Sequence, residues 1–308
     1  MKLAVCVATY RRPVMLAAFL DSLAAIELAL PSPEVFVVVV DNDDGESARP
    51  VIDTRLGRFR FPILTATEQV RNIALARNRS VEIALREGAD WVVIADDDEL
   101  VSPGWLSELL AMQQQTGADV VAGPVVNRYP DGTPAWLVES GLPLRPRYEN
   151  GAMLQVADTA NVLVSRRVFG LVPGHFDARF GLSGGSDSLF FARAHAAGAR
   201  ITWAAAAVVF ETHPRSRVTI GWLLRRAFRN GNAAVHVARS MVPAHAWLPR
   251  RIASASYHFG RGVLLLPAAA VRGRAAGVAA LQELSLGAGA AAAFAGYRYV
   301  EYKRVHGA

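Results

Sequence analysis

Residues 91–99 read Trp-Val-Val-Ile-Ala-Asp-Asp-Asp-Glu. The unbroken apolar run indicates a strand buried on both faces, as in a parallel sheet. Three carboxylates, Asp96, Asp97 and Asp98, follow where that strand should end. Ligands of open α/β sheets bind at the carboxyl ends of the strands, so this one stretch predicts both a fold class and the position of a site.

The acidic triplet also indicates what the site binds. Like charges this close repel, and burying them is costly unless a cation or another positive partner compensates. Hard divalent ions such as Mg²⁺ and Mn²⁺ prefer carboxylate oxygen and usually complete their coordination with substrate phosphates. The triplet therefore predicts a divalent metal and a phosphate-bearing substrate. A solvated turn is the alternative, and the strand before the triplet favours the metal.

Apolar runs alternate with helical patterns through the first two thirds of the chain. Strands are expected at 3–8, 35–40, 61–64, 91–95, 120–126 and 160–164, and helices at 14–25, 70–87, 103–115 and 188–197. The Pro-, Gly- and Arg-rich residues 127–155 are expected to form an irregular excursion near the site. This alternation predicts an α/β fold with a mainly parallel sheet and helices on both faces.

Two polar turns should lie at the same edge as the triplet. Residues 9–12, Thr-Tyr-Arg-Arg, end the first strand, and residues 41–45, Asp-Asn-Asp-Asp-Gly, end the second. Such turns meet around one ligand in an open sheet, where Asp41 could accept hydrogen bonds from a base or ribose; a plain turn is the alternative. Arg77, on the helix before the triplet strand, could hold a diphosphate or be an ordinary surface arginine.

A second chemical signal is the glycine-rich stretch 181–187, Gly-Leu-Ser-Gly-Gly-Ser-Asp, before the helical pattern of 188–197. Glycine and serine allow a tight loop, which places Asp187 where a helix begins. An acidic residue there stabilises the helix end without further function. A base that removes a hydroxyl proton needs the same placement, a carboxylate on a rigid element facing a cleft. Both interpretations are open from the residues alone.

Composition limits the possible classes. The 308 residues are 52% hydrophobic, which excludes a disordered chain and permits a large core. The single cysteine, Cys6, allows no internal disulfide and is expected to be a small core residue in a reducing compartment. The first residues lead directly into residues 9–12 without a signal-peptide pattern, so we expect the enzyme-like part in the cytoplasm.

Charge divides the chain sharply. Residues 214–308 carry 14 Lys and Arg against 2 Asp and Glu, whereas residues 1–213 carry 19 against 25. The tail also contains the apolar residues 263–267 and the alanine-rich residues 275–296, neither of them a convincing bilayer span. We expect these helices to lie on an anionic membrane surface; packing on the domain and true insertion are the alternatives. No nucleic-acid-binding motif accompanies the charge, so no nucleic-acid partner is expected.

Taken together, the ordered motifs resemble those of family 2 glycosyltransferases with the GT-A fold, and most of all the bacterial exopolysaccharide glucosyltransferases of the succinoglycan type. The resemblance covers about residues 1–235 and depends on order and spacing. The motifs are residues 5–13 (VCVATYRRP), 38–42 (VVVDN), 76–78 (ARN), 94–99 (IADDDE) and 184–187 (GGSD).

The resemblance implies roles for particular residues. Those expected to hold the nucleotide are Thr9, Tyr10, Arg12, Asp41, Arg77, Asp96 and Asp97. Asp98 is expected to bind the metal, and Asp187 to be the catalytic base. His213 follows a strand-like run, and in some relatives a histidine at such a place completes the metal shell, although a lone histidine is more often structural.

The implied activity is transfer of a hexose from a nucleotide sugar, expected to be a UDP-sugar, to a lipid-linked or saccharide acceptor in polysaccharide biosynthesis. Inversion and dependence on Mg²⁺ or Mn²⁺ are implied as well. Many relatives have Glu-Asp where this chain has Ser186-Asp187, so one acidic contact to the acceptor is missing. The Gln-x-x-Arg-Trp motif of processive synthases is absent, which favours addition of one sugar per encounter.

Two regions are therefore expected: a GT-A domain over residues 1–235 and a basic, apolar helical region over 236–308 that keeps the enzyme peripherally on the cytoplasmic face of the inner membrane. A nucleotidyltransferase could share the sheet and the metal carboxylates, but no glycine-rich phosphate loop follows the first strand. The same absence disfavours a nicotinamide dehydrogenase. A non-catalytic sugar-nucleotide-binding scaffold stays open, although the presence of both Asp98 and Asp187 argues against it.

Overall fold

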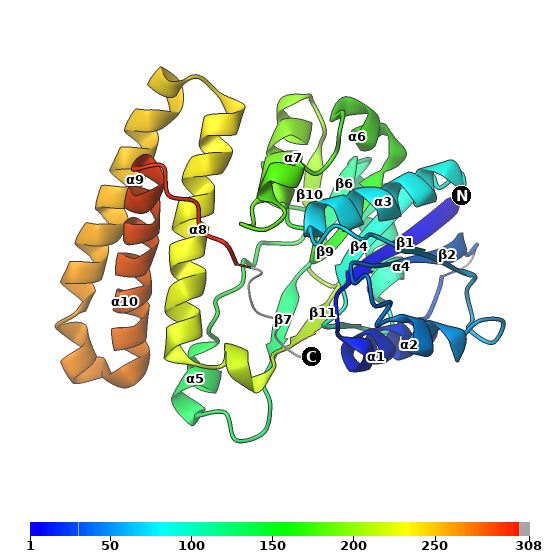
Figure 1. Ribbon diagram of the computed structural model, residues 1–308, viewed down its shortest axis with the longest axis horizontal. Helices are drawn as coiled ribbons and strands as arrows, with labels where there is room; N and C mark the ends of the chain where they lie inside the picture. The colour runs from blue at the N-terminus through cyan, green and yellow to red at the C-terminus, as the bar shows by residue number, and fades with distance from the viewer. Residues whose placement is uncertain (30, 302–308) are drawn as a thin grey trace.

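The structure, a computed structural model, describes residues 1–29 and 31–301. Its main sheet has eight strands in the order β3-β2-β1-β4-β9-β6-β10-β8 (Figure 1). The bounds are β1 (Lys2–Thr9), β2 (Glu34–Asp41), β3 (Ile63–Thr67), β4 (Trp91–Asp96), β6 (Val120–Ala122), β8 (Met153–Leu154), β9 (Asn161–Ser165) and β10 (Ile201–Trp203). All strands except β8 and β9 run in the same direction, which confirms the predicted mainly parallel α/β sheet.

The register of the central strands brings the polar turns to one edge. Strand β1 pairs in parallel with β2 so that Thr9 lies opposite Asp41, and with β4 so that Ala8 lies opposite Asp96. The apolar residues that precede these ends are buried on both faces of the sheet. Consequently three chain segments far apart in sequence end side by side, as expected of parallel strands.

Alternate residues of β1 face two different helical layers. Val5 and Val7 belong to the core under α1 (Pro13–Ala24), α2 (Arg49–Asp53) and α4 (Trp105–Thr116). Ala4 and Cys6 belong to the core under α3 (Ile73–Arg86), α6 (Arg166–Leu171) and α7 (Ser186–Ala196). Cys6 is fully buried, as predicted for a core residue.

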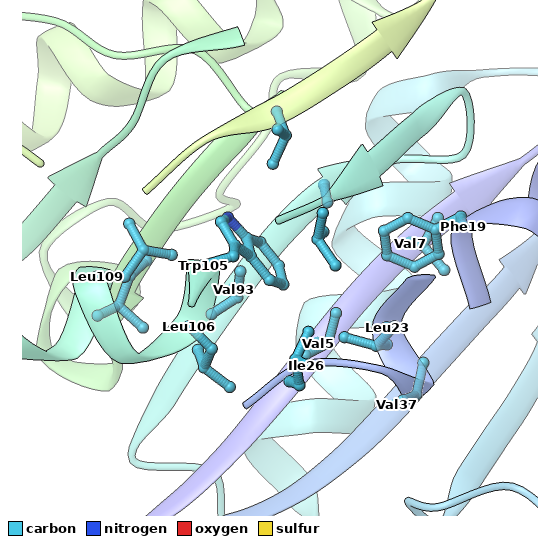
Figure 2. Packing of buried hydrophobic residues seen from close by; sticks show 14 of the residues in the cluster. Val5, Val7, Phe19, Leu23, Ile26, Val37, Val93, Trp105, Leu106 and Leu109 are labelled. Carbon is cyan, nitrogen blue, oxygen red and sulfur yellow. The ribbon is translucent and has the colours of Figure 1, made fainter. Parts of the chain in front are cut away.

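Trp105 anchors α4 on the sheet, beside Val93 and Leu109 (Figure 2). Its side chain is fully buried, and its indole Nε1 donates a hydrogen bond of 2.8 Å to Oδ1 of Asn161. A buried aromatic ring adds roughly 1.5–3 kcal/mol of stability when its polar atom keeps a partner. This packing fixes β4, and with it the acidic triplet, against the first helical layer.

The expected strand at 120–126 is two strands, because residues 123 and 124, Gly-Pro, interrupt it. The second piece, β7 (Val125–Arg128), leaves the main sheet and pairs with β11 (Val209–Thr212), which also pairs with β5 (Glu99–Val101). A Cβ on Gly123 would overlap the carbonyl oxygen of Ala207, so only glycine permits this crossing. The small sheet places β11 next to the acidic triplet, where the backbone N–H of Thr212 donates to the carbonyl oxygen of Asp98 at 2.8 Å.

The excursion at 127–155 is only partly irregular, since it contains α5 (Ala135–Ser140) and β8. Helix α3 begins later than expected, with Asn72 as its N-cap, so Arg71 precedes the helix. The 3-10 turns η1 (Ala178–Phe180) and η2 (Arg215–Arg217) flank the glycine-rich loop and β11 respectively.

Three long helices complete the chain: α8 (Ile220–Met241), α9 (Ala244–Leu265) and α10 (Ala268–Phe294). They form a separate layer beside the sheet, with α10 packed on both others (Figure 1). Small residues permit close approach, because a Cβ on Gly231 would overlap the carbonyl oxygen of Leu286. The boundary expected at residue 235 lies inside α8, and the division into two regions stays a prediction.

One stretch of α10, Ala269–Phe294, is long and apolar enough to cross a membrane by length and composition alone; the mean hydropathy of its most apolar window is 1.2. A third of its most apolar window is buried against the rest of the protein (33%). Such a stretch is equally typical of a helix packed within a soluble protein.

Candidate active site

A cavity of about 810 Å³ opens at the carboxyl edge of β1 and β4. It lies between this edge, the glycine-rich loop and α8, and its size is at the upper end of the range usual for ligand sites. The predicted site residues that line it are Thr9, Tyr10, Arg12, Arg77, Asp96, Asp97, Asp98 and Asp187. A second hollow of about 370 Å³, between β3 and α3, contains none of the predicted site residues.

Arginines surround the acidic triplet. Arg77 Nη2 donates to Asp96 Oδ1 at 2.8 Å, and Arg12 Nη1 donates to Asp97 Oδ1 at 2.9 Å. The Oδ2 atom of Asp98 accepts from Arg12 Nη1 at 3.1 Å and from Arg217 Nη1 at 2.8 Å. Each carboxylate of the triplet thus has a guanidinium partner, which offsets the repulsion within the triplet.

The two buried carboxyls respond oppositely to these surroundings. Burial raises the pKa of Asp97 above its usual range, despite the charge of Arg12 and a 2.6 Å hydrogen bond from Thr9 Oγ1. Burial acts in the same direction on Asp98, but the charges of Arg217 and Arg12 outweigh it and hold the pKa of Asp98 below its usual range. As the pH falls, Asp97 is therefore protonated before Asp98.

The donor atoms fit a divalent ion that is bound mainly through the substrate. In the described residues, no group of three or more His, Cys, Asp and Glu side chains is placed to hold a metal. Mg²⁺ is nonetheless commonly bound by one or two carboxylates together with substrate phosphates. Asp98 suits that role, since both arginine contacts are made to its Oδ2 atom and neither involves Oδ1.

His213 does not line the cavity. Its Nε2 lies 2.9 Å from Oδ1 of Asn127, whose amide Nδ2 donates to the carbonyl oxygens of Gly141 and Pro143. The ring stacks on Tyr129 and is buried. Burial, followed by the charge of Arg145, lowers the pKa of His213 to about 3, so the ring is neutral.

The hydrogen bonds also fix the tautomer of His213. Because Asn127 presents its oxygen, Nε2 of His213 carries the proton and Nδ1 is left as an acceptor. Nδ1 is buried and has no hydrogen-bond partner among the described residues. The metal role of His213 stays a prediction.

Asp41 is turned away from the cavity. Its carboxylate accepts hydrogen bonds from the backbone N–H groups of Asp43 at 3.1 Å and Ala48 at 2.7 Å. It thereby closes the turn after β2, while the neighbouring Asn42 lines the cavity. The structure thus places Asp41 behind the site that the sequence predicts for it, and its contact with the nucleotide stays a prediction.

The glycine-rich loop is held against the start of α3. A Cβ on Gly181 would overlap the side chain of Asn72, which caps α3 by accepting from Ala74 N–H. Gly184 and Gly185 have φ values of 80° and 96°, which favour glycine. The loop therefore depends on its glycines for both its docking and its turn.

Asp187 lies in the first turn of α7 and lines the cavity. The N-cap of that helix is Gly185, and Oδ1 of Asp187 accepts from the backbone N–H of Ser188 at 2.7 Å. Asp158 lines the same cavity. Burial raises the pKa of Asp158, and the negative charge of Asp187 raises it further. Two carboxylates are therefore electrostatically linked at this end of the cavity.

Several cavity residues were not predicted from the sequence, foremost Arg145, Glu211 and Arg217. Arg145 and Arg217 both form ion pairs with Glu211, and Arg217 also reaches Asp98. Of these three, only Arg217 lies in the strongly basic segment after residue 213, whose composition equally fits a membrane-binding surface.

The fold and the cavity together define a sugar-transferring enzyme of the GT-A type. The family model for Glycosyl transferase family 2 matches residues 4–169, more than half of the chain. Succinoglycan biosynthesis protein ExoM of Rhizobium meliloti (strain 1021) is 34% identical over 277 residues, covering 87% of this chain and 86% of that protein. The chain therefore belongs to glycosyltransferase family 2 and is a glycosyltransferase, as its motifs predicted.

Solved structures agree on the fold. Mannosyltransferase PcManGT from Pyrobaculum calidifontis, in complex with GDP-Man and Mn²⁺, has a TM-score of 0.61 and 19% identity, with 95% of this chain and 86% of that chain covered. S. aureus TarS 1–349 in complex with UDP-GlcNAc has a TM-score of 0.52 and 15% identity, with 100% and 95% covered. This chain spans 55% of a longer TarS chain. These similarities confirm the predicted GT-A fold.

Proposed function

We propose that this glycosyltransferase moves a sugar from a nucleoside diphosphate sugar, a UDP-sugar, to a hydroxyl group of a lipid-linked or saccharide acceptor in polysaccharide biosynthesis. The observation that carries the proposal is a single cavity that contains the acidic triplet at the sheet edge and Asp187 at the start of α7. The similarity to a succinoglycan biosynthesis protein supports the polysaccharide context. The nucleotide-sugar complexes of two structural neighbours support the donor class.

The donor would bind at the sheet edge. Thr9 and Tyr10 follow β1, and Arg71 lies over the ring of Tyr10, 4.7 Å from its centroid. Arg12 and Arg77 supply fixed positive charge beside Asp97 and Asp96. Guanidinium groups suit a diphosphate because their donors match its oxygens in pairs.

A divalent ion, Mg²⁺ or Mn²⁺, would be held by Asp98, with His213 as the second predicted ligand. When bound, it would neutralise the charge that develops on the departing nucleoside diphosphate. The low pKa of Asp98 supports this assignment, because a metal ligand must be ionised.

Asp187 would act as the base. Its carboxylate takes the proton of the acceptor hydroxyl, whose oxygen forms the new bond to the anomeric carbon. The bond between that carbon and the phosphate oxygen breaks on the opposite face, and its electron pair leaves with the nucleoside diphosphate. A single displacement of this kind inverts the configuration and adds one sugar per encounter.

The end of the α9–α10 hairpin would hold the enzyme on a membrane. Here, the apolar tip comprises Val263, Leu264, Leu266 and Val271, flanked by Arg261, Arg272 and Arg274. Leu264 and Val271 are 80% and 88% exposed. Apolar side chains beside arginines suit the boundary between headgroups and acyl chains of an anionic membrane. We propose that the enzyme lies peripherally on the cytoplasmic face of the inner membrane and that residues 236–308 make the contact.

The test is release of nucleoside diphosphate from a panel of sugar nucleotides, with and without a lipid-diphosphate acceptor. Release that depends on both the acceptor and one UDP-sugar, with the product anomer opposite to the donor anomer by NMR, is the expected result. No release from any sugar nucleotide, or a product that retains configuration, would contradict the proposal.

A further inference from the structure

The cavity has a second basic region, formed by helices α8 and α9. Arg226 and Arg229 of α8 and Arg251 of α9 line it on the side of the glycine-rich loop. We call these three residues the arginine wall. It is distinct from Arg12 and Arg77, which accompany the acidic triplet.

Acidic side chains do not balance the arginine wall. Arg229 has one weak ion pair, 3.6 Å from Nη1 to Oε1 of Glu301. Among the described residues, Arg226 and Arg251 have no carboxylate within ion-pair distance, and Arg226 lies instead over the ring of Trp222 at 5.2 Å. Positive charge in a partly enclosed site without a counter-ion is costly, and an anionic ligand would remove that cost.

The pKa of Arg226 reflects this imbalance. Burial lowers its pKa, the positive charges of Arg145, Arg229 and Arg217 lower it further, and the charge of Glu301 opposes them only in part. Burial also lowers the pKa of Arg251. The lowered pKa values of Arg226 and Arg251 mean that the surroundings disfavour the charged guanidinium groups.

The position of the arginine wall indicates which substrate the anion belongs to. A Cβ on Gly184 would lie 3.5 Å from Cδ of Arg229, so Arg229 packs on the loop that carries Asp187. The acceptor hydroxyl must approach this same loop if Asp187 removes its proton. Arg251 belongs to α9, the helix that ends in the apolar tip. A group bound here therefore lies beside the loop of the proposed base, on the helices that lead to the proposed membrane contact.

We propose that the arginine wall is a second anion subsite, which holds the phosphate or diphosphate group of the acceptor. This inference rests on the proposed function, because it assigns the first anion subsite to the donor. It specifies the acceptor as one that carries phosphate close to the sugar that is extended.

Glu301 acts as a resident counter-ion at the edge of the subsite. Its backbone N–H donates to the carbonyl oxygen of Leu182 at 2.9 Å, which holds the end of the described chain across the glycine-rich loop. Its carboxylate faces Arg229 and would compete with a ligand phosphate. Neutralising Glu301 should therefore strengthen anion binding, whereas neutralising an arginine of the wall should weaken it.

The experiment is calorimetric titration of inorganic pyrophosphate, and separately of the soluble isoprenoid farnesyl diphosphate, into the full-length protein saturated with UDP and Mn²⁺. UDP occupies the donor subsite, so further binding reports the second subsite. Arg226→Gln and Arg229→Gln should each raise the Kd of both probes about tenfold, because each loses a charge-assisted contact. Glu301→Gln should lower the Kd about threefold, since it removes a competing carboxylate from Arg229.

Arg225→Gln is the matched control, an exposed arginine on the same helix that does not line the cavity. It should leave both Kd values unchanged, and thermal unfolding of every variant would show that it folds. Equal losses for Arg225→Gln and Arg226→Gln would overturn the inference, since only the overall charge would then matter. Absence of pyrophosphate binding to the UDP-saturated wild type would overturn it too.

Two further outcomes separate this inference from its rivals. If Arg226→Gln weakens UDP binding as much as pyrophosphate binding, the wall belongs to the donor and the inference is wrong. If it weakens binding to phosphatidylglycerol vesicles but not to farnesyl diphosphate, the wall contacts lipid headgroups and the inference is wrong as well. Failure of the wild type to bind UDP in the first titration would instead refute the proposed function itself.

Discussion

Asp98 Oδ2 lies 2.8 Å from Nη1 of Arg217, a residue 119 positions further along the chain. The contact joins the end of β4 to the 3-10 turn after β11, so the acidic triplet is closed from behind by the segment that leads into α8. It keeps Asp98 ionised and brings positive charge to the place where the donor diphosphate would lie. The carboxyl-terminal third of the chain thus contributes directly to the candidate active site.

Asp98→Asn should reduce turnover on the order of a hundredfold or more, because it removes the charged oxygen assigned to the metal. The fold should stay intact, since Arg12 still has Asp97 as a partner and Arg217 still has Glu211. Initial rates of nucleotide release with Mn²⁺ and with excess chelator would test this, with the exposed Asp53→Asn as control. Full activity of Asp98→Asn, or undiminished wild-type activity in chelator, would refute the metal assignment.

Asp187→Asn should lower kcat by about two to four orders of magnitude and change the Kd for the sugar nucleotide by no more than about twofold, because a base acts in the transition state. The asparagine oxygen can still accept from Ser188 N–H, so the start of α7 is preserved. Calorimetry for binding and single-turnover kinetics for chemistry would separate the two effects. Unchanged turnover would show that Asp187 only stabilises the helix.

Arg77→Gln should weaken UDP binding about tenfold, because it removes the guanidinium that lies beside Asp96 and faces the donor site. Arg79→Gln is the matched control, an exposed arginine two residues further on the same helix and outside this cavity. Calorimetric titration of UDP would measure both. The same loss in the two variants would argue for a general charge effect.

Leu264→Asp with Val271→Asp should abolish most binding to anionic vesicles without unfolding the protein, because both side chains are largely exposed. Each arginine near such a surface adds on the order of 1 kcal/mol, so high salt should weaken wild-type binding further. Vesicle flotation with neutral and anionic lipid at two salt concentrations is the measurement. Val14→Asp, exposed on α1, is the control. A wild type that ignores both vesicle types would remove the membrane proposal.

His213 should make stability fall as the pH is lowered. Its folded-state pKa is about 3, below the ordinary value of 6.5, so between these pH values the unfolded chain binds a proton that the folded chain does not. The free energy of unfolding then decreases with falling pH, by up to about 1.4 kcal/mol per pH unit. His213→Gln should show a shallower decrease than wild type in urea unfolding between pH 6.5 and pH 4.5. Identical slopes would contradict the buried, neutral imidazole.

Much of the fold could be predicted from local patterns. Apolar runs of strand length specify β1, β2 and β4, since burial on both faces requires them, and parallel strands bring their carboxyl ends to one edge. The glycines at 184 and 185 were likewise readable as a turn, because their positive φ angles favour glycine. The edge position of Asp96, Asp97 and Asp98 follows from these rules alone.

Only the tertiary structure decided which side chains complete the cavity. Asp41 and His213 do not line the cavity. Asp41 accepts hydrogen bonds from backbone N–H groups, and His213 is hydrogen-bonded to Asn127. Arg217 and Arg226 belong to a basic segment whose composition indicates a membrane surface equally well. A sequence pattern records which face of a helix or strand is buried, because residues on one face recur every two positions in a strand and every three or four in a helix. Contacts across more than a hundred residues depend on the path of the chain between them, and no local pattern encodes that path.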